Sequence, residues 1–270
     1  MKKHERLSTY YPLTHKSQIR WLRILIISIL FGCSGKEMPE IYVDQQTEVY
    51  LRDTNIIKKS YLQALSLAKS TGLAVTALTD EEFKKIGVRR NQLLITADTI
   101  GAREESWGFS FQGPASNPGQ CIFSLTYTGT LSIQTPNRSV KYNLENRKMI
   151  DQEAGIPEAF LLHFKALPIK PSTEEEENIP TDVQLTGRGV LLQQPYVEWT
   201  YPDSSMERIW SNGREWGFSE LPSRKNHAAP GALVLALEKP TGSQRLVMTT
   251  KELQIDKKVD RTPFQFDQHR

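Results

Sequence analysis

The sequence has few cysteines and no long apolar run. Only Cys33 and Cys121 occur in 270 residues, which excludes a fold held by several disulfides and a zinc site built from clustered cysteines. A transmembrane helix needs about 20 apolar residues, and the longest apolar run, Ile24–Phe31, is much shorter. We expect Cys121 to be a buried small side chain in a strand. The alternative is a reactive thiol or an intermolecular bridge.

Motifs of catalysis and of metal binding are also missing. The sequence contains no HExxH, no CxxC, no P-loop and no G-x-G-x-x-G after an expected strand. The histidines beyond residue 32 are His163, His227 and His269, which are too widely spaced to predict a metal site. We therefore predict no metal, no cofactor and no enzymatic activity.

One serine lies close to a catalytic pattern. Ser110 follows Gly108 by two residues, but a nucleophile elbow needs a second glycine at 112, and the next glycine is Gly113. A hydrolase with an unrecognised site, for example Ser110 with His163 and an aspartate, is therefore kept as an alternative function.

The N-terminus combines basic residues with the apolar run. Residues 1–32 contain six Lys or Arg residues and one acidic residue, and Ile24–Phe31 and Gly32 follow the last arginine. A basic leader, a short apolar stretch and a small residue before the cleavage site are typical of a secretory signal peptide. We predict that residues 1–32 are such a peptide.

The end of this segment, Leu30-Phe31-Gly32-Cys33, resembles the lipobox of bacterial lipoproteins. The resemblance implies that Cys33 carries a diacylglyceryl group and an acyl chain such as palmitate on its new amino terminus, which together make a stable membrane anchor. Phe31 is bulkier than the residue usual in that family. Ser34 stands where an inner-membrane lipoprotein carries Asp, which favours the periplasmic face of the outer membrane. The alternative is a short buried helix that a cysteine follows by chance.

The basic charge of the whole chain belongs to the leader. Without residues 1–32, the totals of 34 basic and 31 acidic residues fall to 28 and 30, a net charge of −2. The composition therefore gives no electrostatic argument for a nucleic-acid partner, and none is predicted.

Two helices are expected near the start of the remaining 238 residues. Ile57, Tyr61, Ala64, Leu65 and Ala68 recur at helical spacing, after a cap at Asp53 or Thr54 and before Gly72. A second helix is indicated by the capping box from Thr79 to Glu82, which Leu78 and Phe83 flank, and it ends at Gly87.

From residue 93 onward the pattern favours strands, so we predict an α+β fold that is mainly antiparallel β with two short N-terminal helices. A first strand is expected at Ile41–Val43. The further expected strands are Leu93–Ala97, Trp107–Phe111, Cys121–Tyr127, Thr130–Gln134, Val140–Leu144, Phe160–Leu167, Val183–Leu192, Tyr196–Tyr201, Met206–Trp210, Ala232–Leu237, Arg245–Thr249 and Leu253–Asp256. Thr128-Gly129 is expected to form a tight hairpin.

A proline- and glutamate-rich segment at 168–181 is expected to be a solvated linker or long loop, with an acidic recognition loop as the alternative. The predicted organisation is a tether and first strand at 33–52, helices and a first β unit at 53–167, this linker, and a second β unit at 182–270.

The two β units share a sequence pattern. Trp107-Gly108-Phe109-Ser110 recurs as Trp216-Gly217-Phe218-Ser219, and each copy is followed by Pro-Gly and later by Thr-Gly. A duplicated β unit predicts equivalent places for Trp107 and Trp216. The alternative is that Trp-Gly-Phe suits strand ends, and Pro-Gly suits turns, in unrelated places.

Taken together, the sequence predicts a lipid-anchored periplasmic lipoprotein that acts as a non-enzymatic binding or protein-interaction module of the bacterial envelope. The C-terminal run Leu246–Phe264 is similar to the closing strands of periplasmic half-barrel lipoprotein-sorting proteins, which bind acyl chains in a curved sheet. An immunity lipoprotein that neutralises a periplasmic toxin, or a part of a secretion system, is an alternative. The expected partners are the membrane, through Cys33, and an envelope protein.

Overall fold

The structure, a computed structural model, describes residues 39–113, 115–116, 119–135, 137–154, 182–216, 218–222, 232–256 and 258–265. The chain divides into two compact units, Met1–Glu37 and Met38–Arg270. All described residues belong to the second unit. The predicted signal peptide, Cys33, the strand at Phe160–Leu167 and the linker at 168–181 lie outside the described residues.

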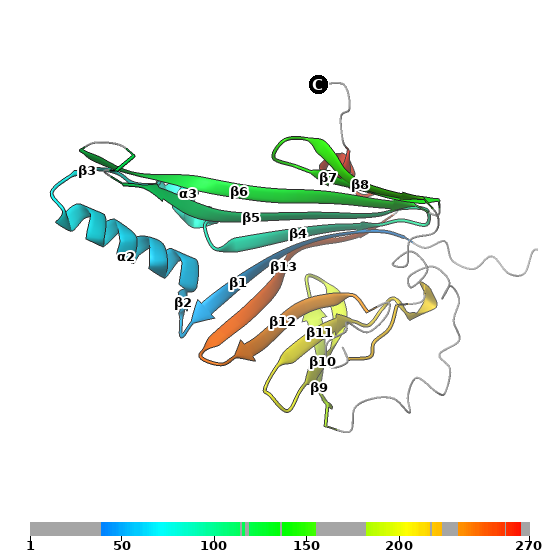
Figure 1. Ribbon diagram of the computed structural model, residues 1–270. Helices are drawn as coiled ribbons and strands as arrows, with labels where there is room; N and C mark the ends of the chain where they lie inside the picture. Colours follow the sequence, from blue (N-terminus) through cyan, green and yellow to red (C-terminus); the bar gives the residue numbers. More distant parts are fainter. Residues whose placement is uncertain are drawn as a thin grey trace, which may run out of the picture. The chain divides into compact units, whose positions relative to one another are not determined.

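The described residues form mainly strands, and two α-helices lie near the N-terminal end of the described chain (Figure 1). The elements before residue 155 are β1 (Glu40–Leu51), β2 (Thr54–Asn55), α2 (Ile56–Ser70), β3 (Ala74–Thr76), α3 (Asp80–Lys85), β4 (Val88–Ile95), β5 (Ile100–Gln112), β6 (Gln120–Thr135), β7 (Arg138–Asn143) and β8 (Lys148–Ala154). The later elements are β9 (Gln184–Leu191), β10 (Gln194–Thr200), β11 (Met206–Trp210), the 3₁₀ turn η1 (Arg214–Trp216), β12 (Val234–Thr241), β13 (Gln244–Asp256) and the 3₁₀ turn η2 (Thr262–Phe264).

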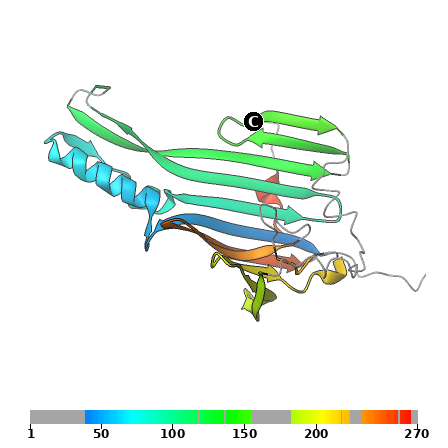
Figure 2. The same ribbon diagram turned by 60° about the horizontal axis from the view of Figure 1, so that its bottom comes forward.

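All strands of the described residues join one sheet, whose main path has the order β8-β7-β6-β5-β4-β1-β13-β12-β11-β10-β9. Outside this path, β2 pairs with β1, and β3 pairs in parallel with β6. Every neighbouring pair in this order is antiparallel. The sheet therefore consists of two meanders that meet where β1 pairs with β13, and Figure 2 shows β7–β8 and β9 at its two ends. The prediction of a mainly antiparallel β fold is confirmed.

The two helices have the signals that the sequence predicts. Thr79 and Glu82 form the capping box of α3, and Gly72 and Gly87 follow the two helices with φ of 74° and 75°. The N-cap of α2 is Asn55, whose side chain accepts from the amides of Ile57 and Lys58, so the cap expected at Asp53 or Thr54 is wrong. Thr54 and Asn55 both pair with β1 in the short strand β2, and Asn55 is the residue directly before the first helical residue, Ile56.

Some strand boundaries differ from the prediction. Thr128-Gly129 is not a hairpin, because β6 continues through it and Gly129 pairs with Glu105 of β5. The two strands expected at Arg245–Thr249 and Leu253–Asp256 are one strand, β13, which runs through Lys251 with a bulge in its pairing to β1. β8 was not predicted, because every residue in it is exposed and its polar sequence carries no burial pattern.

The duplication of a β unit is contradicted. Trp107 lies within β5, whereas Trp216 ends the 3₁₀ turn η1. Thr128-Gly129 lies inside a strand, whereas Gly242 turns the chain from β12 into β13 with φ of 60°. The two Trp-Gly-Phe segments thus share a sequence pattern without sharing a local structure.

Apolar side chains cover both faces of the central strands. On one face, α2 and α3 cover Cys121 and Phe123, and Val259 and Phe264 cover Tyr42 and Leu94 further along. We call it the helix-side face. On the opposite face, Ile41, Val43 and Ile95 pack against Trp210 and Leu235 of the second meander. A further cluster around Val197, Trp199 and Ile209 lies within the second meander.

Candidate functional site: a charged and aromatic belt

The helix-side face carries a polar zone between its two apolar clusters. Alternate residues of β5 point to this face: Gly101 lies under Phe264, and Phe109 packs against Tyr61 of α2. Between them on the same face lie Arg103, Glu105 and Trp107. We define the belt as these three residues together with Asp44 of β1, Arg90 of β4 and Tyr127 of β6.

Two buried carboxylates hold the arginines of the belt. Asp44 and Glu105 are each 6% exposed. The Arg90 guanidinium donates to Asp44 through Nε, at 3.0 and 2.9 Å, and through Nη2, at 2.5 Å. Arg103 Nη2 donates to Glu105 Oε1 at 2.8 Å, and its Nη1 donates to the Pro263 carbonyl at 3.2 Å.

These contacts set the electrostatics of the belt. Arg90 Nη1 also lies 3.9 Å from Glu105 Oε2, so the four charges form a neutral network across three neighbouring strands. The hydrogen bonds to Asp44 raise the pKa of Arg90, which stays protonated. A buried carboxylate is tolerated where an arginine pairs with it and hydrogen bonds satisfy its oxygens.

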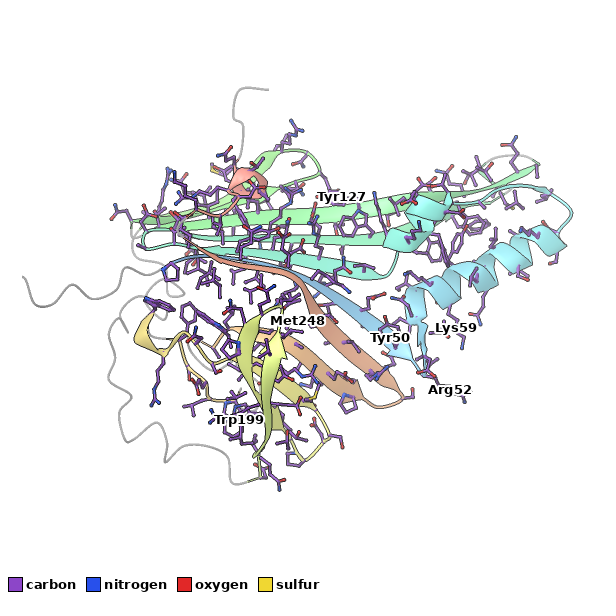
Figure 3. All side chains as sticks on the ribbon, turned by 180° about the vertical axis from the view of Figure 1, so that it is seen from behind. Tyr50, Arg52, Lys59, Tyr127, Trp199 and Met248 are labelled. Carbon is purple, nitrogen blue, oxygen red and sulfur yellow. The ribbon has the colours of Figure 1, made fainter. Side chains whose placement is uncertain are left out.

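The aromatic part of the belt adjoins Glu105. Trp107 and Tyr127 pair directly across β5 and β6, with ring centroids 5.8 Å apart, and Figure 3 labels Tyr127 on the long β6 strand. The Tyr127 hydroxyl donates to Glu105 Oε1 at 2.9 Å. Burial, and then this hydrogen bond to a carboxylate, raise the pKa of Tyr127 to about 12. The phenol therefore stays a hydrogen-bond donor at physiological pH.

The belt is partly accessible to solvent. The side chains of Arg90 and Arg103 are 38% and 29% exposed, and Trp107 and Tyr127 are half-buried. The arrangement therefore presents two guanidinium groups and the Tyr127 ring, which the buried carboxylates hold, and the Trp107 ring, which packs against Tyr127.

Of the candidate residues named from the sequence, Cys121 and Ser110 lie in the described part of the chain. Cys121 is buried in β6 and has no disulfide partner among the described residues, so its predicted burial is confirmed. Ser110 lies exposed on β5, and His163, His227 and His269 lie outside the described residues. Trp199 and Trp210 are buried in the second meander, where Figure 3 labels Trp199.

Most of the belt was missed by the sequence reasoning. We expect from the sequence that Arg89-Arg90 is an exposed dibasic turn after a helix, but both residues lie in β4, and Arg90 reaches Asp44. The sequence gives no alternation signal for this part of β4, because Arg89 to Gln92 are four polar residues in a row between Val88 and Leu93.

The described residues offer neither a cluster of metal ligands nor a membrane-spanning helix. They contain no group of three or more His, Cys, Asp or Glu side chains that could hold a metal ion. No helix in the same part of the chain is long and apolar enough to cross a membrane.

Comparisons with known proteins give little further information. No protein-family model matches the chain, and no curated protein matches it. Among solved structures, it is similar to a DUF1329 family protein from Desulfovibrio piger, with 9% sequence identity and a TM-score of 0.27. That match covers 92% of this chain and 97% of the other.

Proposed function

We propose that the protein is a lipid-anchored lipoprotein on the periplasmic face of a bacterial membrane, the outer membrane being favoured, and that it binds an envelope protein through the belt without catalysis. The anchor is Cys33, supported by the basic leader and by Leu30-Phe31-Gly32-Cys33. The binding role is supported by one structural observation, the arrangement of side chains along β5.

Along β5, the helix-side face is covered at both ends and accessible in between. Phe264 lies over Gly101 at one end, and Tyr61 of α2 packs against Phe109 at the other. The uncovered stretch of β5 includes Trp107 and Glu105, whose partners on the neighbouring strands are Tyr127 and Arg90. Tryptophan, tyrosine and arginine are the residue types most enriched at binding hot spots.

The buried carboxylates support a binding role by holding these groups in place. Because Asp44 and Glu105 already fix Arg90, Arg103 and Tyr127, a partner would not have to order those side chains. Less ordering leaves more of the interaction free energy for binding. The carboxylates themselves are paired, and so the same contacts favour binding over proton transfer.

The belt can be tested by photo-crosslinking the full chain in the cell envelope. A benzophenone amino acid at position 107 would lie on the belt, and the same group at position 110 would lie on the same strand but on the opposite face of the sheet. We expect a discrete crosslinked protein from position 107 that is absent from position 110. Equal products from both positions, or none from position 107, would contradict the proposal.

A further inference from the structure

The two outer strands of the sheet, β8 and β9, are unpaired on their outer sides within the described residues. Each carries large apolar side chains in solvent: Met149 and Ile150 of β8 are 56% and 54% exposed, and Leu185 and Val190 of β9 are 47% and 69% exposed. An unpaired strand edge with exposed apolar side chains is a template for pairing with another chain.

The two edges are complementary in length. β8 has seven residues and β9 has eight, which correspond to about 23 and 26 Å of strand at roughly 3.3 Å per residue. Each strand has one bulge in the pairing to its inner neighbour, and the regular stretches that remain for edge pairing are Asp151–Ala154 of β8 and Gly187–Leu191 of β9, which are also similar in length.

The two edges are also complementary in charge. β8 contains Lys148, Asp151 and Glu153, a net charge of −1, and Arg188 is the one charged residue of β9. Pairing β8 with a second β8 would bring Asp151, at the middle of the strand, close to its own copy. Like charges opposite each other destabilise a sheet, whereas opposite charges stabilise it.

We propose that β8 of one copy of this chain pairs with β9 of a second copy, so that the sheet continues from chain to chain. The contact is heterologous, because it uses a different surface on each copy, and it leaves one free β8 and one free β9 at the ends of every assembly. It does not depend on the function assigned to the belt.

Charge substitutions on each edge provide the test. Asp151 and Glu153 share one face of β8, and Arg188 and Val190 share one face of β9. In Asp151→Lys, the new cation would face Arg188 of the second copy, and in Val190→Glu the new carboxylate would face Asp151 and Glu153. Each single variant should raise the protein concentration needed for association by roughly tenfold or more. The double variant Asp151→Lys/Val190→Glu should associate again, because its two new charges attract. The matched control is Leu67→Lys, which alters a 70% exposed side chain of α2, a helix that packs over Cys121 and Phe123 of β6.

The measurement is sedimentation velocity of the full chain in detergent across a wide range of protein concentration, with circular dichroism to confirm folding. We expect concentration-dependent association of the wild type and of Leu67→Lys, loss of it in each single variant, and its return in a mixture of the two single variants. Each of those variants keeps one unaltered edge, so the mixture can pair. A wild type that stays monomeric throughout, single variants that associate like the wild type, or a mixture that stays monomeric would overturn the proposal.

Discussion

The hydroxyl oxygen of Tyr127 lies over Gly129, only 2.5 Å from the place where a β-carbon on that residue would be. The ring carbon that bears the hydroxyl is 2.9 Å from the same place. Glycine at this point of β6 therefore gives the phenol the room to reach Glu105. The glycine that resembled a hairpin turn in the sequence is instead part of the packing of the belt.

Gly129→Ala should consequently displace Tyr127 and destabilise the fold by about 1–3 kcal/mol, as overpacking of a filled site does. The matched control is Gly187→Ala in β9, where an added β-carbon would come no closer than 3.7 Å to Glu198. The control should be neutral or stabilising by roughly 0.5–1 kcal/mol, because a strand glycine is entropically costly. Urea unfolding measures both variants, and equal effects would refute this explanation of Gly129.

Tyr127 should also make stability fall at alkaline pH. Its pKa is raised to about 12 from an ordinary value of 10.0, so between these values the folded chain holds a proton that the unfolded chain has lost. This stabilisation is complete below pH 10 and disappears as the pH rises through the folded pKa. Tyr127→Phe should be less stable at neutral pH, by about 1.5–3 kcal/mol for a hydrogen bond to a charged group.

Between pH 10 and 12, the same variant should lose stability less steeply than the wild type. The test is a series of urea unfolding curves across this range. Identical slopes for the two proteins would show that Tyr127 ionises equally in the folded and unfolded states.

Asn55 should be the most sensitive residue at the start of α2. Its Oδ1 accepts from the amides of Ile57 and Lys58, and its Nδ2 donates to Glu48 and to the Gly87 carbonyl, each at 3.0 Å. Asn55→Ala removes the cap and both hydrogen bonds of Nδ2, a loss of roughly 2–4 kcal/mol.

Asn55→Ser separates the contribution of the helix cap from that of the hydrogen bonds to Glu48 and Gly87. Serine can still cap the helix, but it cannot reach both Glu48 and Gly87, so the variant should lie between the wild type and Asn55→Ala in thermal unfolding. A serine variant as unstable as the alanine variant would mean that the cap contributes little.

Local signals in the sequence predicted the helices well. The capping box at Thr79 and Glu82 and the glycines that end both helices act over a few residues, and the structure has them as expected. Strand identity was also largely predictable from alternating apolar residues. Strand ends were not, because pairing with β5 carries β6 straight through Thr128-Gly129.

The belt could not be predicted because its contacts join residues far apart in the sequence. Arg90 meets Asp44 across 46 positions, and Tyr127 meets Glu105 across 22. Neither pair has a spacing signal, since strand register alone brings these residues together. The predicted duplication was wrong for the same reason. Pairing to β6 fixes Trp107 in a strand, whereas Trp216 lies in a 3₁₀ turn.

The most direct test of the proposed function concerns its anchor, Cys33. Cys33→Ser and the control Cys121→Ser, which alters the buried cysteine of β6, would be expressed as full chains in cells given labelled palmitate, and the membranes would then be separated from soluble protein. We predict that the wild type and Cys121→Ser incorporate the label and sediment with the membranes, whereas Cys33→Ser is unlabelled and does not. A Cys33→Ser chain that is labelled and fractionates like the wild type would contradict the lipoprotein assignment.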